Sequence, residues 1–527
     1  MATLKRQVFP LSIDGGYNTE AGPHAGFRLR GDGIVSVPWL LTANNVIYNL
    51  DGWPQKMPGA SRINTVTTGA TDAVMGIFDY WRSTASGDPV QKRVIYAGSA
   101  IYKDDADGTW DSLLTGLETG KMPAFEVMND NLVMASTSTL DVPQSYNQTT
   151  IANLGGSPPN FAFHVQHKDR MWAAGVDTNK SRLYYTILSN EADWTGAGSG
   201  SIDISPDDGD VITGLASHKD ELWIFKGPNK GSIWRITGSA PTGADAFVLH
   251  IFIRGVGTTS HQSIIRSRDD LWFFDDLGIH SLVATAAFGD YNEAFLSKDI
   301  ATAFNRDLNH SRFRYVWGTN FVTAGYAIWV VARSGNTNNN QVVLLDYRFT
   351  PMRIALWPAV SAASVAMVRD TSNQPRPWFG SYDGFALRGN QAGRNWAGSA
   401  YNADVLLPYL SFGDPFLDKQ ASVGRVGYAP KGDTTFTVGY QRDGNTQQTA
   451  SVSQGGVATL GTSSDQFTLD ASTLGGGRHL NQFFDMAGQF KEIQFELSQG
   501  TLNVEFEPHS FAVQVESAGI GTTDPLG

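Results

Sequence analysis

The chain has 527 residues, of which 41% are hydrophobic, only 17% are charged and 56 are glycine, and its formal net charge is −12 at pH 7. It contains no cysteine, which excludes disulfide bridges, iron–sulfur clusters and thiolate zinc sites. This composition disfavours a helical or doubly wound enzyme, and the acidic balance disfavours a protein that wraps nucleic acid through clustered lysine and arginine.

Residues 1 to about 42 are expected to form an extended N-terminal arm, because six glycines between positions 15 and 33 break any helix. The first ten residues include two basic side chains but no apolar core of signal-peptide length, and no apolar run reaches membrane-spanning length. We therefore expect a protein made and folded in the cytoplasm. An arm that cannot bury a core alone either orders on a neighbouring subunit or stays loose.

A β-hairpin is predicted over residues 45–57. Two apolar runs flank Asp51-Gly52, a pair that suits a type I′ turn in which both central residues have positive φ. Pro54 places the second strand at a sheet edge, and Pro58-Gly59 ends it.

A tryptophan-centred motif then recurs at a spacing of about 50 residues, and its sharpest copy is Lys219–Phe225. The tryptophans of the five clear copies are Trp172, Trp223, Trp272, Trp329 and Trp378. Each unit combines three or four short strand-like runs with a charged turn, which is typical of a β-propeller blade. The tryptophan run is apolar throughout, so we expect it to be an inner strand buried against neighbouring blades. Fainter copies near Tyr96 and Met134 bring the candidate units to seven, within a propeller spanning residues 43–395; another β architecture is the alternative.

One helix is predicted near residues 297–309, inserted between two of the repeats. Its apolar positions recur every four residues: Leu296, Ile300, Phe304 and Leu308. Ser297 is the expected N-cap, and Asp299 favours the positive end of the helix dipole. We expect this helix to fill a loop, with a subunit contact as the alternative.

Alternating apolar residues predict a C-terminal antiparallel β-sandwich or barrel over residues 404–516, followed by a loose tail at 517–527. The alternating sets are Phe436, Val438 and Tyr440; Ile493, Phe495 and Leu497; Leu502, Val504 and Phe506; and Phe511, Val513 and Val515. The fold class is therefore all-β: a β-propeller with an N-terminal arm and hairpin and a C-terminal β-domain.

Asn44-Asn45 with the following apolar run, Asp51-Gly52 and Lys56-Met57-Pro58-Gly59 resemble the opening signature of bacteriophage tail nozzle and stabilisation proteins, the tail tubular protein B-like propellers of short-tailed phages. Family members often carry Arg-Pro-Gly or Lys-Pro-Gly, and this chain inserts Met57. The order of hairpin, tryptophan repeats, single helix and terminal β-domain is also similar over nearly the whole chain.

The resemblance implies a non-catalytic virion protein, a nozzle or hub subunit that forms a homo-hexameric ring extending the phage tail channel. Its implied partners are other copies of itself, the adaptor on the portal side, a tail fibre or needle protein, and genomic DNA passing through the lumen without sequence-specific contact. Like charge would keep that DNA from sticking to an acidic wall. No cofactor and no membrane insertion are implied, and the protein would be assembled in the host cytoplasm and reside in the virion tail.

The competing interpretation is a carbohydrate-binding or glycoside-cleaving propeller, such as a tailspike or lectin. A third interpretation is a host propeller that serves as an interaction platform, although the arm and the terminal sheet have no role in such a protein.

Two acidic turns are weak candidates for a metal site. In Lys103–Trp110, Asp104, Asp105 and Asp107 offer oxygen atoms that suit calcium, and the segment partly matches the Asp-box turn of sialidase-like propellers. The carboxylate expected at the twelfth position of a calcium loop is replaced by Gly116, so an ordinary acidic turn is favoured. For Ser205–Asp210, the second acidic turn, an ordinary turn is likewise favoured.

No catalytic residue and no cofactor-binding residue is predicted. Sialidase chemistry requires a cluster of arginines, and the candidates are Arg266, Arg268, Arg312 and Arg314, which lie on repeat flanks. His164 and His167 are three apart in a predicted strand, so they face opposite sides and do not have metal-ligand spacing. Gly227–Ser232 has the residue types of a phosphate-binding loop without its order.

Overall fold

The computed structural model describes residues 6–13, 15–25, 28–29, 35–37, 39–63, 72–83, 87, 89–104, 109–137, 140–284, 295–413, 415–428, 434–454 and 480–517. The protein is all-β and divides into two compact units. Unit 1 comprises residues 1–60, 344–359 and 391–527, and unit 2 comprises residues 61–343 and 360–390. Unit 2 is therefore inserted into unit 1, which differs from the predicted succession of arm, propeller and terminal domain.

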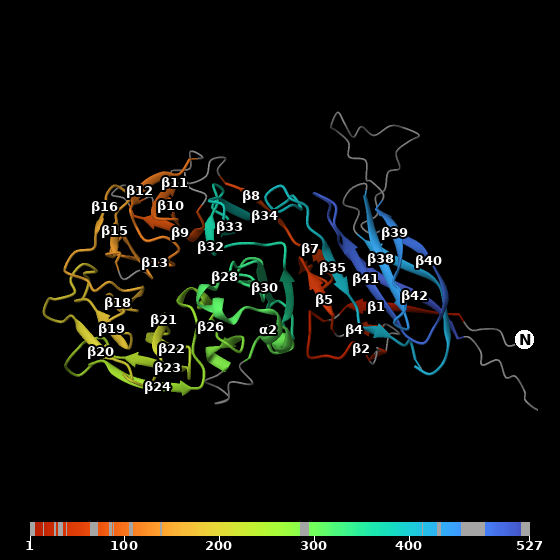
Figure 1. The fold of residues 1–527 in the computed structure, drawn as a ribbon, viewed down its shortest axis with the longest axis horizontal. Coiled ribbons are helices and arrows are strands. Elements are labelled where there is room, and N and C mark those ends of the chain that lie inside the picture. The colour runs from red at the N-terminus through yellow and green to blue at the C-terminus, as the bar shows by residue number, and fades with distance from the viewer. Residues whose placement is uncertain are drawn as a thin grey trace, which may run out of the picture. The chain divides into compact units, whose positions relative to one another are not determined.

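Unit 2 is a β-propeller, with seven blades in the part of it that the structure describes: six are separate sheets, and one is formed by the last three strands of an 11-stranded sheet (Figure 1). The first four sheets have four strands each: β9 (Val74–Arg82), β10 (Val90–Ala97), β11 (Ala100–Asp104) and β12 (Asp111–Thr115); β13 (Pro123–Met128), β14 (Asn131–Ser136), β15 (Gln144–Tyr146) and β16 (Ile151–Asn153); β17 (Phe163–His167), β18 (Arg170–Ala174), β19 (Arg182–Tyr185) and β20 (Gly200–Asp203); β21 (Val211–His218), β22 (Glu221–Gly227), β23 (Ser232–Thr237) and β24 (Val248–Arg254).

The remaining three sheets are built from β25 (Ile265–Ser267), β26 (Asp270–Phe274) and β27 (Ile279–Ser281); β28 (Trp317–Phe321), β29 (Tyr326–Val331) and β30 (Gln341–Asp346); and β32 (Ser364–Arg369), β33 (Pro375–Gly380) and β34 (Ala386–Gln391), with β8 (Gly59–Arg62) beyond β34. We refer to these seven sheets, in chain order, as blades 1 to 7.

The first strands of the blades form a closed ring. β9, β13, β17 and β21 pack one against the next, η1 (His261–Ser263) lies between β21 and β28, β25 packs against β28, β28 against β32, and β32 against β9 (Figure 1). The ring is closed by hydrogen bonds: Ser364 Oγ donates to the Val74 carbonyl at 2.7 Å, and the Val74 N–H donates to the Ser381 carbonyl at 2.9 Å. Each blade can thus bury both of its faces against neighbours.

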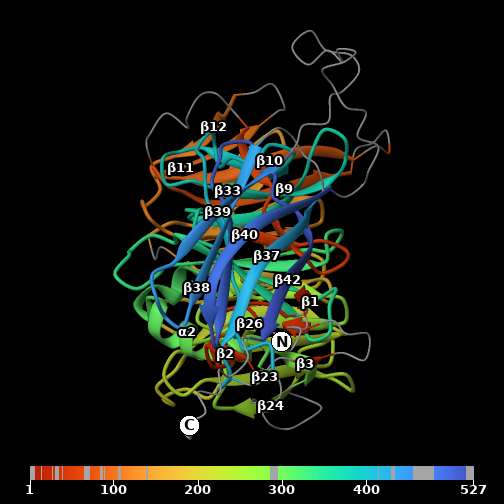
Figure 2. The same ribbon diagram turned by 90° about the vertical axis from the view of Figure 1, so that its right-hand side faces the viewer.

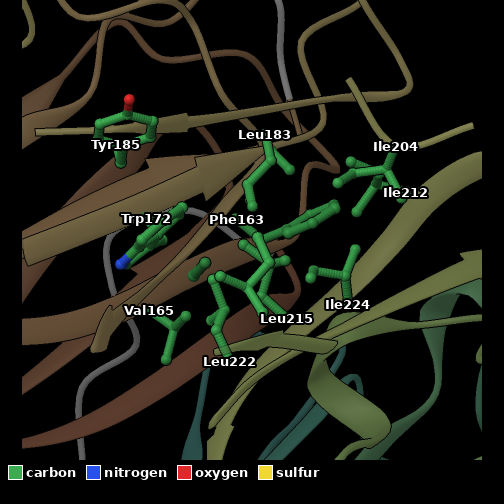
Figure 3. Close-up of a cluster of buried hydrophobic side chains, with 13 residues drawn as sticks. Phe163, Val165, Trp172, Leu183, Tyr185, Ile204, Ile212, Leu215, Leu222 and Ile224 are labelled. Carbon is green, nitrogen blue, oxygen red and sulfur yellow. The ribbon is translucent and has the colours of Figure 1, made fainter. Parts of the chain in front are cut away.

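The repeated tryptophans lie on the second strand of blades 3 to 7, where all five are buried. This confirms the prediction that the tryptophan strand is internal. Between blades 3 and 4, Trp172, Leu183 and Ile204 pack against residues of the next blade, including Leu215 and Leu222 (Figure 3).

The helical insertion consists of η2 (Lys298–Ile300), α2 (Ala301–Asp307) and η3 (His310–Tyr315). Ile300, Phe304 and Leu308 are buried, as their spacing predicts. Ser297 is the N-cap residue of η2, as predicted, but its hydroxyl makes no capping bond and instead accepts the backbone N–H of Ile279 at 2.9 Å. Ser297 therefore attaches the insertion to β27. In the described residues no helix is long and apolar enough to cross a membrane.

Unit 1 is built on two sheets. The first has the order β3 (Arg28–Leu29), β4 (Val35–Val37), β1 (Arg6–Ile13), β42 (Pro508–Ser517), β37 (Lys419–Tyr428) and β40 (Leu480–Phe490), and Figure 2 shows β1, β42, β37 and β40 side by side. The second includes β2 (His24–Ala25), β36 (Tyr409–Leu410), β41 (Ile493–Gln499), β35 (Ala403–Leu406), β5 (Thr42–Asn44) and β31 (Arg353–Trp357), with β38 (Thr434–Arg442) beside β41 and β39 (Gln448–Gln454) beside β38.

Phenylalanines from the two sheets of unit 1 meet in a shared core. Phe511 of β42 contacts Phe495 of β41, with ring centroids 4.9 Å apart, and both side chains are buried. The predicted alternation of β38, β41 and β42 is observed, since Phe436, Val438 and Tyr440 and the matching residues of the other two strands are buried. The predicted strand at 502–506 is wrong: these residues form no strand, and Leu502 is 45% exposed.

Two expectations for the N-terminal region are also corrected. The segment expected to be an arm contributes β1, which pairs antiparallel with β42 of the same chain and buries Phe9, Leu11 and Ile13. The hairpin of β6 (Val46–Tyr48) and β7 (Pro54–Lys56) has positive φ at Gly52 but not at Asp51, so its turn is not type I′. The Asn49 side chain instead accepts the N–H groups of Asp51 and Trp53 and closes a longer loop.

Candidate functional site

The centre of unit 2 contains a cavity of about 380 Å³ that is lined by the first strand of every blade. A second cavity of about 410 Å³ is lined by other residues of the centre, among them Lys121 and Arg314. His261 and Gln262 of η1 line both cavities, so these two side chains lie between them.

The η1 residues are fixed from three directions. Gln262 Nε2 donates to the carbonyl of Pro123 in β13 at 2.9 Å, which joins blade 5 to blade 2 across the ring. The His261 ring stacks on Phe163 at 5.1 Å, and its Nδ1 accepts the N–H of Leu215 at 3.3 Å. The centre of the propeller is thus blocked by its own side chains, and we call these two residues the plug.

Three charged side chains line the 380 Å³ cavity: Asp79 of β9, Glu126 of β13 and Arg266 of β25. Asp79 accepts hydrogen bonds from Gln91 Nε2 at 2.6 Å and from the Arg369 N–H at 2.9 Å. Arg266 is an exposed residue. Glu126 is half-buried, and desolvation raises its pKa to about 7, although the charge of Arg266 and the backbone N–H groups of Val127 and Gln166 act in the opposite direction.

Two buried nitrogen atoms on residues of the cavity wall lack hydrogen-bond partners. His164 is 1% exposed, and its Nε2 must carry the proton because it faces the carbonyl of Val133 at 3.1 Å. Its Nδ1 is therefore an acceptor without a donor, and the Trp317 Nε1–H is a donor without an acceptor. Desolvation lowers the pKa of His164 to about 3, so the ring stays neutral at physiological pH.

The predicted acidic turns are occupied by protein groups. Asp104, which is almost fully buried, pairs with Arg93 at 3.1 Å, whereas Asp105 and Asp107 lie outside the described residues. In the second turn, Lys226 places its ammonium group 2.8 Å from both carboxylate oxygens of Asp208, where a cation would sit. Within the described residues no group of three or more His, Asp or Glu side chains has the arrangement of a metal site.

The Gly227–Ser232 loop is also satisfied internally. The backbone N–H groups of Asn229, Lys230 and Gly231 converge on the carboxylate of Asp210, at 2.7 to 3.2 Å. A carboxylate of the chain therefore takes the donors that a phosphate would need.

The structure brings two of the four candidate arginines together and separates the other two. Arg312 and Arg314 both lie over the ring of Tyr315, 3.8 and 4.8 Å from its centre, and Arg314 lines the second cavity. Arg266 lines the first cavity, and Arg268 lies in an exposed turn. The opposite orientation of the two histidines is confirmed, because His164 contacts Val133 of blade 2 and His167 Nδ1 contacts Ser217 Oγ of blade 4.

Acidification from pH 7 to pH 5 is expected to destabilise unit 2. Desolvation lowers the pKa of His164 to about 3 and those of His167 and His261 to about 4, so below pH 6.5 the unfolded chain takes up protons that the folded chain excludes. Glu126 works in the opposite direction, since its raised pKa favours the protonated folded state between pH 7 and 4.5. The net loss is roughly 2–4 kcal/mol, measured by urea denaturation at the two pH values.

The His164→Gln/His261→Gln variant should show a weaker pH dependence, whereas replacing the exposed His250 should leave the dependence unchanged. Equal stability of the unmodified protein at pH 7 and pH 5 would contradict this account. An unchanged dependence of stability on pH in the double variant would also contradict it.

No family model and no curated protein matches the sequence. Similar solved structures include YCF48 bound to D1 peptide, at 10% identity and a TM-score of 0.36, and a gluconolactonase from Xanthomonas campestris, at 11% identity and a TM-score of 0.30; each match covers 66% of this chain and 97% of the other. An exo-β-1,3-galactanase from Phanerochaete chrysosporium with galactose matches at 11% identity and a TM-score of 0.24, over 87% of this chain and 100% of that one. At these values the similarities assign no function.

Proposed function

We propose that the chain is a structural protein of a virion, a tail nozzle or hub subunit of a short-tailed bacteriophage. In this proposal six copies form a ring that extends the tail channel. The ring contacts the adaptor on the portal side and a fibre or needle protein, and genomic DNA passes through its lumen. The chain performs no chemistry.

The observation that carries the proposal is the position of the motif residues that resemble the nozzle signature, because they connect distant segments of unit 1. Asn45 Nδ2 donates to the carbonyl of Asn402 at 2.6 Å, and its Oδ1 accepts the N–H of Ala359 at 3.0 Å. Lys56 is fully buried: its Nζ donates to the carbonyl of Thr501 at 3.0 Å and lies 4.7 Å from the ring centre of Tyr401. The side chains of this short motif therefore make contacts that few other residue types could make, which supports a structural reason for the motif.

Gly59, the last residue of the motif, supports the same point. A methyl group on its Cα would overlap the carbonyl oxygens of Gly393 and Asn395. Its N–H donates to the carbonyl of Gly393 at 2.8 Å. Glycine is needed here because the two backbones approach closely, so the Pro-Gly end of the motif has a structural cause.

Unit 1 also exposes apolar side chains on the outer face of its six-stranded sheet. Val8 of β1 is 60% exposed and Phe483 of β40 is 65% exposed, whereas the next residues in sequence, Phe9 and Phe484, are buried on the inner face. Exposed apolar groups on one sheet face are typical of protein–protein interfaces. In our proposal this face contacts another subunit of the ring or the adaptor.

The Phe483→Asp variant should therefore fail to assemble while it still folds. Since Phe483 is exposed, the free energy of unfolding should change by less than about 0.5 kcal/mol. Native mass spectrometry should show a shift from the oligomer to the monomer. Val322→Asp is the control, because Val322 is 63% exposed but lies in unit 2. Rings of unchanged mass in Phe483→Asp would exclude this face as the contact between ring subunits.

The proposed function itself is tested by electron microscopy of the purified chain, alone and with the adaptor of the same phage. We expect sixfold rings. A particle that stays monomeric with the adaptor present, or that hydrolyses a glycan, would favour the carbohydrate-active alternative.

A further inference from the structure

We propose that the 380 Å³ cavity at the centre of unit 2 binds a small acidic sugar, such as a uronic acid, in contact with Arg266 and Glu126. This site is independent of ring assembly, so each of the two proposals can fail without the other.

The charge of the ligand follows from Arg266. Arg266 is exposed and lines the cavity, and no carboxylate of the described residues forms an ion pair with it. Burial raises the pKa of the nearby Glu126 to about 7, so its carboxyl group carries only part of a negative charge at neutral pH. Asp79 carries the other charge, but its two oxygens already accept hydrogen bonds from Gln91 and the Arg369 backbone. A planar guanidinium group without a partner suits a carboxylate, which it can bind through two parallel hydrogen bonds.

The hydroxyl groups of the ligand follow from Glu126, which lines the cavity and is half-buried. Because burial raises the pKa of its carboxyl group to about 7, this group can both donate a hydrogen bond and accept one at neutral pH. A sugar hydroxyl, which also donates and accepts, can therefore bond to it. The unpartnered Nδ1 of His164 and Nε1 of Trp317 have almost no accessible surface, so they take no part in this site.

The apolar part of the cavity wall suits the ring of a sugar. Phe78 of β9 and Phe125 of β13 stack on each other with ring centroids 5.4 Å apart, and both line the cavity and are half-buried. Exposed aromatic surface beside polar groups is typical of small-molecule sites, and the volume falls at the lower end of their range. One or two sugar rings fit this size better than a longer oligosaccharide does.

Isothermal titration calorimetry with D-glucuronic acid and with D-glucose tests the proposal, because the two sugars differ mainly in the carboxylate. Glucuronate should bind at least about tenfold more tightly than glucose, since an ionic, bidentate contact is stronger than a neutral one. Arg266→Gln should remove this preference. Arg254→Gln, which changes an exposed arginine of β24 in the same unit, should retain it. Met367→Trp fills part of the cavity and should weaken the binding of both sugars.

Absence of glucuronate binding would overturn the proposal, as would equal affinities for the two sugars. Binding that survives both Arg266→Gln and Met367→Trp would place the sugar elsewhere on the protein. The oligomeric state of each variant, measured in parallel, separates a loss of the sugar site from a loss of assembly.

Discussion

Replacing Trp329 with alanine is expected to lower the free energy of unfolding by about 3–5 kcal/mol. Trp329 is completely buried in β29, a strand in which every residue is buried, and Gly318 of β28 packs so closely that a methyl group there would collide with the indole. The Trp329 Nε1–H donates to the carbonyl of Ser263 at 3.0 Å. The substitution would therefore leave a cavity and also an unsatisfied carbonyl in η1, next to the plug.

Urea denaturation measures the loss, and hydrogen exchange of the β29 and η1 peptides locates it. Trp329→Phe retains most of the ring but lacks the donor, so it should lose less stability while increasing exchange at η1. Trp234→Ala is a suitable comparison because Trp234 is half-buried and donates only to Ser232 within its own strand. A loss in Trp329→Ala no larger than that in Trp234→Ala would refute the central position of the repeat tryptophans.

The propeller could be predicted from sequence because its repeats share local contacts. Trp172 and Trp223 both donate through Nε1 to the carbonyl five residues earlier, His167 and His218, at 3.3 Å. A contact of this kind requires the same short sequence in both blades, so the repeat is visible there. Blades 5 and 6 keep the tryptophan although its Nε1–H has another partner, Asp270 for Trp272 and Ser263 for Trp329. The first blade is fainter because its second strand carries a tyrosine, Tyr96, whose hydroxyl donates to the carbonyl of Glu118.

The division into units could not be predicted, because it depends on pairings between segments that are remote in sequence. Val8 lies opposite Gln514, and Asn44 opposite Asp404. Alternating apolar residues indicate that a strand has a buried face, but they do not identify the strand beside it. For this reason β1 was expected to be an arm and β5 was assigned to the propeller.

The central cavity was missed for a related reason. Asp79, Glu126 and Arg266 are separate charged residues within strands, and only closure of the ring brings them to one cavity. One sequence feature could have indicated the site. Each of the three is a charged residue within the first strand of a blade, at a position where an apolar side chain is usual. Arg266 was among the four candidate arginines. The sequence alone could not distinguish it from Arg268, which is two residues away and faces solvent.

Replacing Lys226 with methionine is expected to cost about 3–5 kcal/mol of unfolding free energy, comparable to the loss in Trp329→Ala. The Lys226 side chain has no exposed surface, and its ammonium group donates to the carbonyls of Ile204 and Ser205 at 2.8 Å as well as to Asp208. Methionine has a similar length but no charge. Two carbonyls and a carboxylate would lose their donor together, and Asp208, whose side chain is only 22% exposed, would be left without its counter-charge.

Lys230→Met provides the matched control, since Lys230 is exposed four residues away and its replacement should change stability by less than about 0.5 kcal/mol. In Lys226→Met/Asp208→Leu both charges are removed, and part of the loss should be recovered because the uncompensated carboxylate is gone. If Lys226→Met were as stable as Lys230→Met, the stability of the acidic turn would not depend on Lys226, and a cation site at Ser205–Asp210 would have to be considered again. The expected loss of stability would instead indicate that the protein supplies the positive charge at this turn itself.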